Sequence, residues 1–490
     1  MTIAHTLPAY GIYVDGERKA ASTGATYTIP NPATEEPVAE IADATRDDLR
    51  AAIIAARRAF DDGPWRRAAR MDRRNVLYAI ADGLERRKDD ARRMLLSAAG
   101  VPQAMIGVQL DKPIEMLRWY GDLAVKFDAE QVLPPVELAA PGGVRVCTSL
   151  VVHQPVGVCA MIPTWNGPLI IIAQKLGPGI AMGNTMVFKP SPLMPLIDLL
   201  VAEVIAECDL PKGVYNLITG QSPDLGQDLV ESPMVDKVSF TGSVPTGKRI
   251  AETAARTLKR VHLELGGKSA ALVLDDADLD QVAPVLAAGV FIGAGQGCSR
   301  TTRVLVQEKR QEALLEKMAA FTQKSVKLGD PIDPDVLVGP VIREESRRRI
   351  EGYIEAGKHD GATLVLGGGR PQQCPRGYFV EATLFGNVRN DMKIAAEEIF
   401  GPVISVIPFR DEEDAIRIAN ASSYGLAGAI LTRDEAKAIA IAKRVRTGNV
   451  SINGAYNIFG PIGGFKESGL GREGGIFGLR EFSEVQCITW

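Results

Sequence analysis

Two patterns of apolar and polar positions divide this chain. From residue 156 onward, short apolar runs predict strands at 156–162, 185–189, 214–218 and 237–240. The segments between them have helical character and begin near Pro168, Pro195 and Leu225. Strands that alternate with helices in this way are typical of a parallel sheet with crossover helices. The pattern therefore predicts an α/β protein whose ligands bind at the carboxyl ends of the strands.

The N-terminal part follows another pattern. Residues 10–42 are rich in turn-forming residues and predict extended structure. Asp47 is expected to cap a helix that runs to Phe60, because apolar residues recur at helical spacing along it. A more charged helical region covers about 70–99. We expect these N-terminal helices to face solvent and to carry no chemistry.

Composition narrows the class of protein. A chain of 490 residues exceeds a single hydrophobic core, so two or three domains are expected. The formal net charge of -4, from 56 basic and 60 acidic residues, gives no basic surface for nucleic acid and no attraction to a membrane. Residues 146–174 lack charged side chains, but prolines interrupt them, which favours buried elements over a membrane span.

Cysteine usage indicates the compartment. The six cysteines form no C-x-x-C pair, which argues against a disulfide framework and against a zinc or other metal site. The N-terminus has no basic start followed by an apolar core, so no secretory signal is expected. Together these features predict a cytoplasmic protein.

Three loops follow the predicted strands, at 163–168, 189–192 and 240–249. The third begins a helix, and a glycine turn at a helix N-terminus is an anion site. Gly242 and Lys248 have the spacing of a phosphate loop, but Arg249 stands where a hydroxyl should hold magnesium. A second Gly-Lys-Ser, at 267–269, has His262 where the first glycine should be. These defects disfavour a nucleoside triphosphatase. The anion expected at the start of this helix is therefore the pyrophosphate of a dinucleotide.

Two residues have side chains suited to covalent catalysis. Cys298 follows four small residues within 293–297, so little side-chain bulk shields its sulfur. This stretch alone is equally compatible with a turn that holds an inert buried cysteine. Glu264 lies in a strand-like apolar segment, where it is either an ion-pair partner or a base whose pKa is raised by desolvation.

Four motifs in register resemble the aldehyde dehydrogenase superfamily. They are LELGGK at 263–268, GQGC ending at Cys298, EEIFGPV at 397–403 and PIGGFKESGLGRE at 461–473. The resemblance extends over nearly the whole chain, starting from NPATEE at 31–36.

The resemblance implies three structural parts. They are a Rossmann-type dinucleotide-binding domain (1–130 and 155–262), an α/β catalytic domain (263–460) and a small β oligomerisation arm (131–154 and 478–490). Val485 and Ile488 would be poor choices for a free sheet edge, which favours a homodimer or homotetramer.

The same resemblance implies four catalytic roles. Cys298 adds to the aldehyde to give a thiohemiacetal, which loses hydride to a nicotinamide and becomes a thioester. Glu264 activates the water that hydrolyses it. The Asn166 amide and the Cys298 backbone N–H bind the oxyanion. Lys175 resembles a lysine linked to proton transfer, although a lysine on a helix surface is equally expected.

For the cofactor, the resemblance implies NAD. Ser243 would contact the pyrophosphate, Lys189 the adenosine ribose, and Glu398 the nicotinamide ribose with Phe400 beside it. Seven more positions would line the cofactor site, namely Ile162, Pro163, Thr164, Trp165, Ser191, Gly242 and Leu265. Pro192 stands where NAD-selective members often carry a glutamate, so NADP is possible as well.

Departures from the family pattern concern the substrate. Gly167 stands where many members have an aromatic residue, and Ile462 where a phenylalanine is common. We expect a wide apolar channel for bulky aliphatic, terpenoid or aromatic aldehydes, lined by Gly167, Ile171, Phe291, Phe459 and Ile462. A coenzyme A-acylating enzyme is the alternative that Glu264 argues against. A non-catalytic nucleotide-binding structural protein is the other, and the thiol, base and amide together argue against it.

Overall fold

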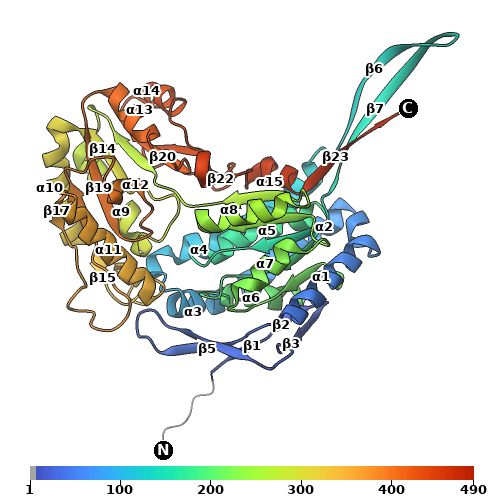
Figure 1. Cartoon of the computed structure of the whole chain (residues 1–490), viewed down its shortest axis with the longest axis horizontal. Helices are drawn as coiled ribbons and strands as arrows, with labels where there is room; N and C mark the ends of the chain where they lie inside the picture. Colours follow the sequence, from blue (N-terminus) through green and yellow to red (C-terminus); the bar gives the residue numbers. More distant parts are fainter. Residues whose placement is uncertain (1–6) are drawn as a thin grey trace, which may run out of the picture.

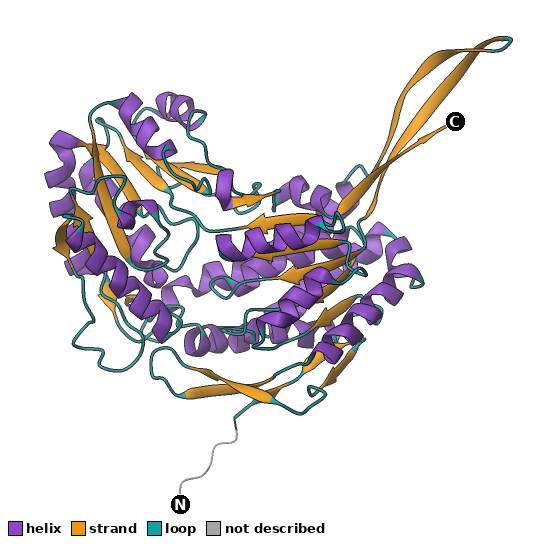
Figure 2. Cartoon of the chain, viewed as in Figure 1, coloured by secondary structure: helices purple, strands orange, loops and turns teal. Residues whose placement is uncertain are grey.

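The computed structural model describes residues 7–490. Two α/β units lie side by side, and an arm of long strands projects away from both (Figure 1). Colouring by secondary structure shows helices covering the sheets of both units, with the arm formed of strands alone (Figure 2).

The first unit is built on an eight-stranded sheet. Its order is β22-β12-β11-β8-β9-β10-β2-β3. The strands span Gly469–Leu470, Arg260–Glu264, Lys237–Thr241, Val158–Ile162, Thr185–Phe188, Tyr215–Leu217, Ile12–Val14 and Glu17–Lys19. The five from β12 to β10 are parallel, which confirms the predicted parallel sheet. Sequence order reverses between β8 and β11, and ligands of such sheets bind at the carboxyl ends beside this point.

Crossover helices follow these strands as predicted. They are α5 (Pro168–Ala181), α6 (Leu196–Ile205), α7 (Pro223–Glu231) and α8 (Val244–Ala255). The preceding helix, α4 (Ile106–Lys126), packs against α5. Side chains of α4, α5, α6 and β8 to β10 contribute to the first hydrophobic core, whereas those of α7 and α8 pack in another cluster of the same unit.

The N-terminal segment differs from the prediction in two details. Strands β1 (Ala9–Tyr10), β4 (Thr26–Pro30) and β5 (Pro37–Ala42) confirm its extended character. Thr45, not Asp47, caps α1 (Arg46–Asp61), because its hydroxyl and the Asp48 carboxylate form a reciprocal capping box.

The charged region that follows α1 also departs from the prediction. It forms two helices, α2 (Arg70–Arg86) and α3 (Lys88–Ala98). Leu77 and Ile80 of α2 are fully buried, so this helix contributes to the core and does not merely face solvent.

The second unit has a seven-stranded sheet of order β17-β18-β19-β14-β13-β20-β21. Its strands span Thr363–Leu366, Thr383–Gly386, Val403–Phe409, Arg303–Gln307, Ala270–Val273, Ala427–Leu431 and Asn449–Ile452, and only β17 is antiparallel. The covering helices are α9 (Leu279–Phe291), α10 (Gln311–Ser325), α11 (Glu344–His359), α12 (Lys393–Ala396), α13 (Glu412–Asn420) and α14 (Glu435–Ala442). A separate hydrophobic core fills this unit.

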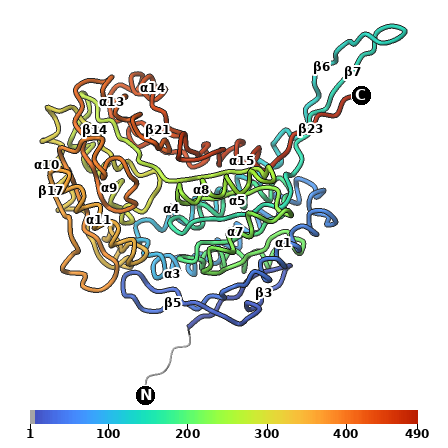
Figure 3. Tube along the Cα trace, viewed as in Figure 1, coloured from blue at the N-terminus to red at the C-terminus, as the bar shows by residue number. Residues whose placement is uncertain are grey.

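The chain passes between the units twice. It leaves the first sheet at the end of β12 and enters the second at β13. It returns through β22 and α15 (Gly475–Glu481), a path that the trace makes visible in red beside the green of α8 (Figure 3). The end of β12 and the returning segment therefore lie at the junction of the two units.

The arm is a three-stranded antiparallel sheet of order β23-β7-β6. It consists of β6 (Glu130–Ala140), β7 (Gly143–Pro155) and β23 (Ser483–Thr489). Large apolar side chains on it are exposed, Val132 at 67% and Val485 at 62%. Among residues 7–490, no helix has both the length and the apolar character to cross a membrane. That same span contains no group of acidic, histidine and cysteine side chains placed to hold a metal ion.

Candidate active site

Glu264 is the last residue of β12, at the junction. Its backbone carbonyl accepts a hydrogen bond from the Gly242 N–H at 2.9 Å, which fixes the strand end against the turn before α8. The side chain is buried at 7% exposure. Burial raises the pKa of Glu264 well above its ordinary value, and the negative charge of Glu473 adds to the shift. The carboxyl is therefore neutral over a wider pH range than in water.

Cys298 lies in the loop that follows α9. Gly295 has a φ of +69°, and a Cβ there would be 2.1 Å from the carbonyl oxygen of Gly401. Only glycine fits, and this close approach ties the loop to the segment that carries Glu398. Burial raises the pKa of the Cys298 thiol to about 12, and the charges of Glu398 and Glu264 contribute next.

Two glycines of the passage between the sheets join these groups. The Gly267 N–H donates to Glu398 Oε1 at 3.1 Å, and a Cβ on Gly266 would be 2.1 Å from Glu398 Oε2. A Cβ on Gly267 would lie 2.6 Å from the carbonyl oxygen of Cys298. The Ser468 hydroxyl donates to Gly266 O at 2.7 Å. Motifs far apart in the sequence are thus in direct contact.

The loop after β8 reaches the cysteine loop from the first unit. Asn166 Nδ2 donates to the backbone carbonyl of Gln296 at 3.0 Å, two residues before Cys298. The neighbouring Trp165 meets Phe400 edge-on, with ring centroids 5.7 Å apart. The side-chain amide of Asn166 therefore lies beside the thiol loop, as an oxyanion donor requires.

The carboxyl ends of the same strands also carry groups that can bind an anion or a hydroxyl group. Ser243 is the N-cap of α8, and no side chain bonds the free backbone N–H groups of this helix start. Lys189 is buried, its Nζ contacts only two carbonyl oxygens at 3.3 and 3.4 Å, and burial lowers its pKa to about 8. Ile162, Pro163, Thr164, Ser191, Gly242 and Leu265 lie at or just beyond the ends of the same strands.

Lys175 is not on a helix surface. It is fully buried within α5, and its Nζ donates to Glu473 Oε1 at 2.6 Å and to Ser239 Oγ at 2.9 Å. The sequence indicated no role for Glu473, although it ends the motif at 461–473. Its contact with Lys175 depends on the return of the chain to the first unit.

Most of the predicted channel residues lie near α4 and α5 of the first unit, but Phe291 lies in the second unit. Gly167 and Ile171 lie at the start of α5, and Phe459 packs on Trp119 of α4 with ring centroids 5.2 Å apart. Ile462 is held by paired backbone hydrogen bonds with Glu473. Phe291 is fully buried within the core of the second unit, so it does not face solvent at the site.

One buried polar residue near these positions was missed from the sequence. Gln109 of α4 is 4% exposed, and its Oε1 has no hydrogen-bond partner within residues 7–490. This oxygen lies 3.8 Å from where a Cβ on Gly167 would be. A helical glutamine carries no sequence signal of such a position.

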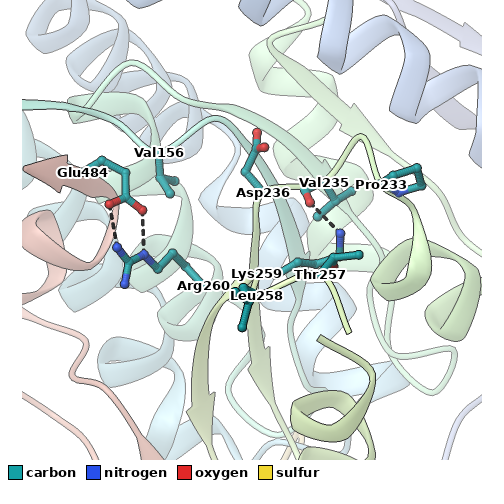
Figure 4. Close-up of a pocket in the computed structure, with 9 residues that line it drawn as sticks. All are labelled: Val156, Pro233, Val235, Asp236, Thr257, Leu258, Lys259, Arg260 and Glu484. Carbon is teal, nitrogen blue, oxygen red and sulfur yellow. Dashed lines mark hydrogen bonds and ion pairs between the residues drawn. The ribbon is translucent and has the colours of Figure 1, made fainter. Parts of the chain in front are cut away.

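A surface hollow lies at the other end of the first sheet, before β11 and β12 (Figure 4). Several of its polar side chains already have hydrogen-bond partners. Lys259 donates to the carbonyl of Val235 at 2.8 Å, and Arg260 forms a bidentate pair with Glu484 at 2.6 and 2.7 Å. None of the predicted site residues lines it, so the junction is the better candidate.

These features define an α/β enzyme with a dinucleotide site next to a thiol, a carboxyl and an amide. Residues 19–488 match the model of the aldehyde dehydrogenase family. The chain belongs to the aldehyde dehydrogenase family. This confirms the family and the α/β fold predicted from the sequence.

Known relatives match over almost their whole length. Betaine aldehyde dehydrogenase 1 of Oryza sativa subsp. japonica is 38% identical over 100% of this chain and 97% of its own. An NAD-dependent aldehyde dehydrogenase structure from Sinorhizobium meliloti has a TM-score of 0.94 and 35% identity, covering 99% of this chain and 95% of that one. A betaine aldehyde dehydrogenase mutant of Staphylococcus aureus, in complex with NAD+ and with a BME-modified cysteine, has a TM-score of 0.94 and 35% identity over 98% and 95%.

Proposed function

We propose that this chain oxidises a neutral, apolar aldehyde to a carboxylic acid with NAD, through a covalent intermediate on Cys298. The observation that carries this proposal is the convergence of Cys298, Glu264 and Asn166 at the junction of the two units. NAD is the cofactor, in keeping with the NAD+ complex of the Staphylococcus aureus relative. Bound NAD supplies the acceptor for the hydride that leaves the substrate carbon.

The residues of the chain perform the remaining steps. The Cys298 thiol loses its proton to solvent as its sulfur adds to the aldehyde carbon, and the Asn166 amide and the Cys298 N–H stabilise the oxyanion that forms. Loss of hydride converts this adduct to a thioester. Glu264 then removes a proton from water as the water attacks the thioester carbon, and the carboxylic acid leaves as the thiol is restored.

The cofactor contacts follow from the strand ends. The start of α8 at Ser243 would bind the pyrophosphate, Lys189 the adenosine ribose, and Glu398 the nicotinamide ribose, with Phe400 beside it. Pro192 can neither accept a hydrogen bond from the ribose hydroxyls nor repel a 2'-phosphate. We therefore expect NAD to be preferred and NADP to be tolerated.

The charges on α4 support a neutral substrate. Its acidic side chains have cationic partners, with Asp111 bound to Lys88 and Glu115 bound to Lys112. The buried polar group that faces Gly167 is the uncharged Gln109. A cationic aldehyde would receive no counter-charge from this helix, whereas Trp119 and Phe459 offer apolar surface.

The arm supports assembly into a dimer or tetramer. The apolar side chains on β6, β7 and β23 are exposed in the single chain, and an edge of this kind is usually covered. We propose that the arm of a second copy or its second unit covers them.

Replacing the nucleophile tests the mechanism. Cys298→Ala should abolish NADH formation from aldehydes and leave NAD binding unchanged, because no cofactor contact is altered. Cys374→Ala, on a half-buried cysteine of another loop, is the matched control and should retain parental activity. Aldehyde oxidation by Cys298→Ala above the rate without enzyme would disprove the mechanism.

A substrate panel tests the finer statements. Parent enzyme is assayed with acetaldehyde, a long-chain or aromatic aldehyde and betaine aldehyde, each with NAD and with NADP. The bulky neutral aldehydes should give the highest kcat/KM. A clear preference for betaine aldehyde would contradict the neutral channel. The panel is repeated with coenzyme A added, where an acyl-coenzyme A product would identify the acylating alternative. NAD binding without turnover of any aldehyde would identify the non-catalytic one.

A further inference from the structure

His262 lies two residues before Glu264 on β12, so both side chains are on the same face of the strand. Its side chain is fully buried. The Nε2 atom lies 3.3 Å from Glu264 Oε1, and the Nδ1 atom lies 3.3 Å from Glu473 Oε1. One imidazole thus spans the gap between two buried carboxyl groups.

The two ends of the ring differ in their other contacts. Nδ1 is also 3.3 Å from Ser239 Oγ, which in turn contacts Glu473 and Lys175. Nε2 and Glu264 Oε1 have no directed hydrogen bond to any group in residues 7–490. Each is the other's polar neighbour, at a distance of 3.3 Å that lies just beyond the usual hydrogen-bond range.

Charged groups surround the ring from every element packed on it. They are Lys175 on α5, Lys237 on β11, Glu264 on β12, Arg472 and Glu473 after β22, and Glu481 on α15. Burial lowers the pKa of His262 well below its ordinary value, and the charge of Lys175 adds to this. The imidazole is therefore neutral, with one nitrogen as donor and the other as acceptor.

We propose that His262 relays a proton between Glu264 and Glu473, and so acts as a positioning residue that sets the protonation of Glu264. This inference rests on the proposed function of Glu264 as base. Glu264 must lose its own proton before it can take one from water. Glu473, paired with Lys175 at 2.6 Å, is the anionic carboxylate available to receive it.

The proton count balances over thioester hydrolysis. The proton that the Cys298 thiol lost when the thioester formed has already left to solvent, because the oxidation as a whole releases one proton. The proton on Glu264 Oε1 passes to His262 Nε2 while the proton on Nδ1 passes to Glu473 Oε1, so the ring stays neutral and changes tautomer. Glu264 then accepts a proton from the attacking water and gives it to the departing Cys298 thiolate. The relay runs back from Glu473 to Glu264, and the resting state is restored.

His262→Gln tests the relay. Glutamine retains a donor and an acceptor but cannot move a proton from one end to the other. We expect steady-state kcat to fall by about 10- to 100-fold. This loss is at or below the lower limit of the rate enhancement that a general acid or base usually provides, because Glu264 itself is retained. The pre-steady-state burst of NADH should persist or grow, since thioester formation continues while its hydrolysis slows. The pH at half-maximal kcat should rise, because Glu264 can then no longer pass its proton through His262 to Glu473.

A matched control and a second variant complete the test. His359→Gln makes the same chemical change on an exposed side chain of α11 and should leave the pH profile and kcat unaltered. Where His262→Gln does not fold, His262→Asn provides the same measurement. A parental kcat and pH profile in the folded variant overturns the relay. So does loss of the NADH burst with a lowered unfolding temperature, which indicates a structural role alone.

Glu264→Gln separates failure of this inference from failure of the proposed function. If it slows thioester hydrolysis while His262→Gln does not, only the relay is wrong. If Glu264→Gln turns over like the parent, the role of Glu264 as base is wrong, and the relay fails with it.

Discussion

Gly267 should tolerate no side chain, because a Cβ at this position would meet the backbone of the cysteine loop itself. A Cβ there would lie 2.6 Å from the carbonyl oxygen of Cys298, about 0.8 Å inside the 3.4 Å at which ordinary contact begins. The same Cβ would be 3.0 Å from Leu426 Cβ, so it cannot move away from the cysteine freely. Gly267→Ala must therefore displace the backbone that carries the thiol.

The size of the effect follows from this displacement. A misplacement of about 1 Å costs roughly 100-fold in rate when reacting groups must be aligned. Overpacking of a tight interior costs about 1–3 kcal/mol of stability. We expect Gly267→Ala to lower kcat/KM for aldehyde oxidation by about 100-fold. We also expect it to lower the unfolding free energy by about 1–3 kcal/mol.

The assay compares NADH formation and chemical denaturation of Gly267→Ala with those of Gly289→Ala. Gly289 lies in α9, and a Cβ there would meet nothing within 4 Å. The control should retain activity and gain about 0.4–1 kcal/mol, because alanine restricts the unfolded chain. A Gly267→Ala enzyme within about threefold of the parental kcat/KM would refute the argument, since that effect is far below the 100-fold expected.

Two further predictions concern the thiol and the arm. Alkylation of Cys298 by iodoacetamide, measured against Cys298→Ala as background, should accelerate about tenfold per pH unit up to about pH 11, because the thiol is protonated below its pKa of about 12. A plateau near pH 9 would contradict this. Val485→Lys should weaken self-association at least tenfold, because burying the valine is worth about 1.5–3 kcal/mol and an unpaired charge costs more. Sedimentation of the variant at the parental size would contradict the role of the arm.

Local patterns predicted the parallel sheet of the first unit well. The parallel strands β8 to β12 have strong apolar runs, and the loops after them carry Asn166, Lys189 and Ser243 as expected. Errors arose where neighbouring signals compete. Thr45 and Asp47 are both good N-caps, and only the reciprocal bond between Thr45 and Asp48 decides between them.

Contacts made by the returning chain could not be predicted in the same way. In the sequence, His262 stands out only because it occupies the place of a glycine in a phosphate-loop pattern. The carboxylate that faces its Nδ1 belongs to a distant segment after β22. For the same reason, the sequence leaves Lys175 equally compatible with a helix surface and with a role in proton transfer. Phe291 is the last residue of an apolar helix whether it faces a channel or a core, and only the packing of the second unit buries it. Polar partners across such distances are set by topology, which residue spacing does not encode.

The electrostatics of the junction explain why a proton outlet belongs there. Burial raises the pKa of both Cys298 and Glu264, and the charge of Glu264 raises that of the thiol further. Neither group is therefore charged at rest, and ionising one makes ionising the other harder. In the proposed mechanism the two must ionise in turn within one cycle. In the proposed relay the proton of Glu264 passes to the chain of His262, Glu473 and Lys175, which lies directly beside that carboxyl, so Glu264 can ionise without releasing its proton into the substrate site.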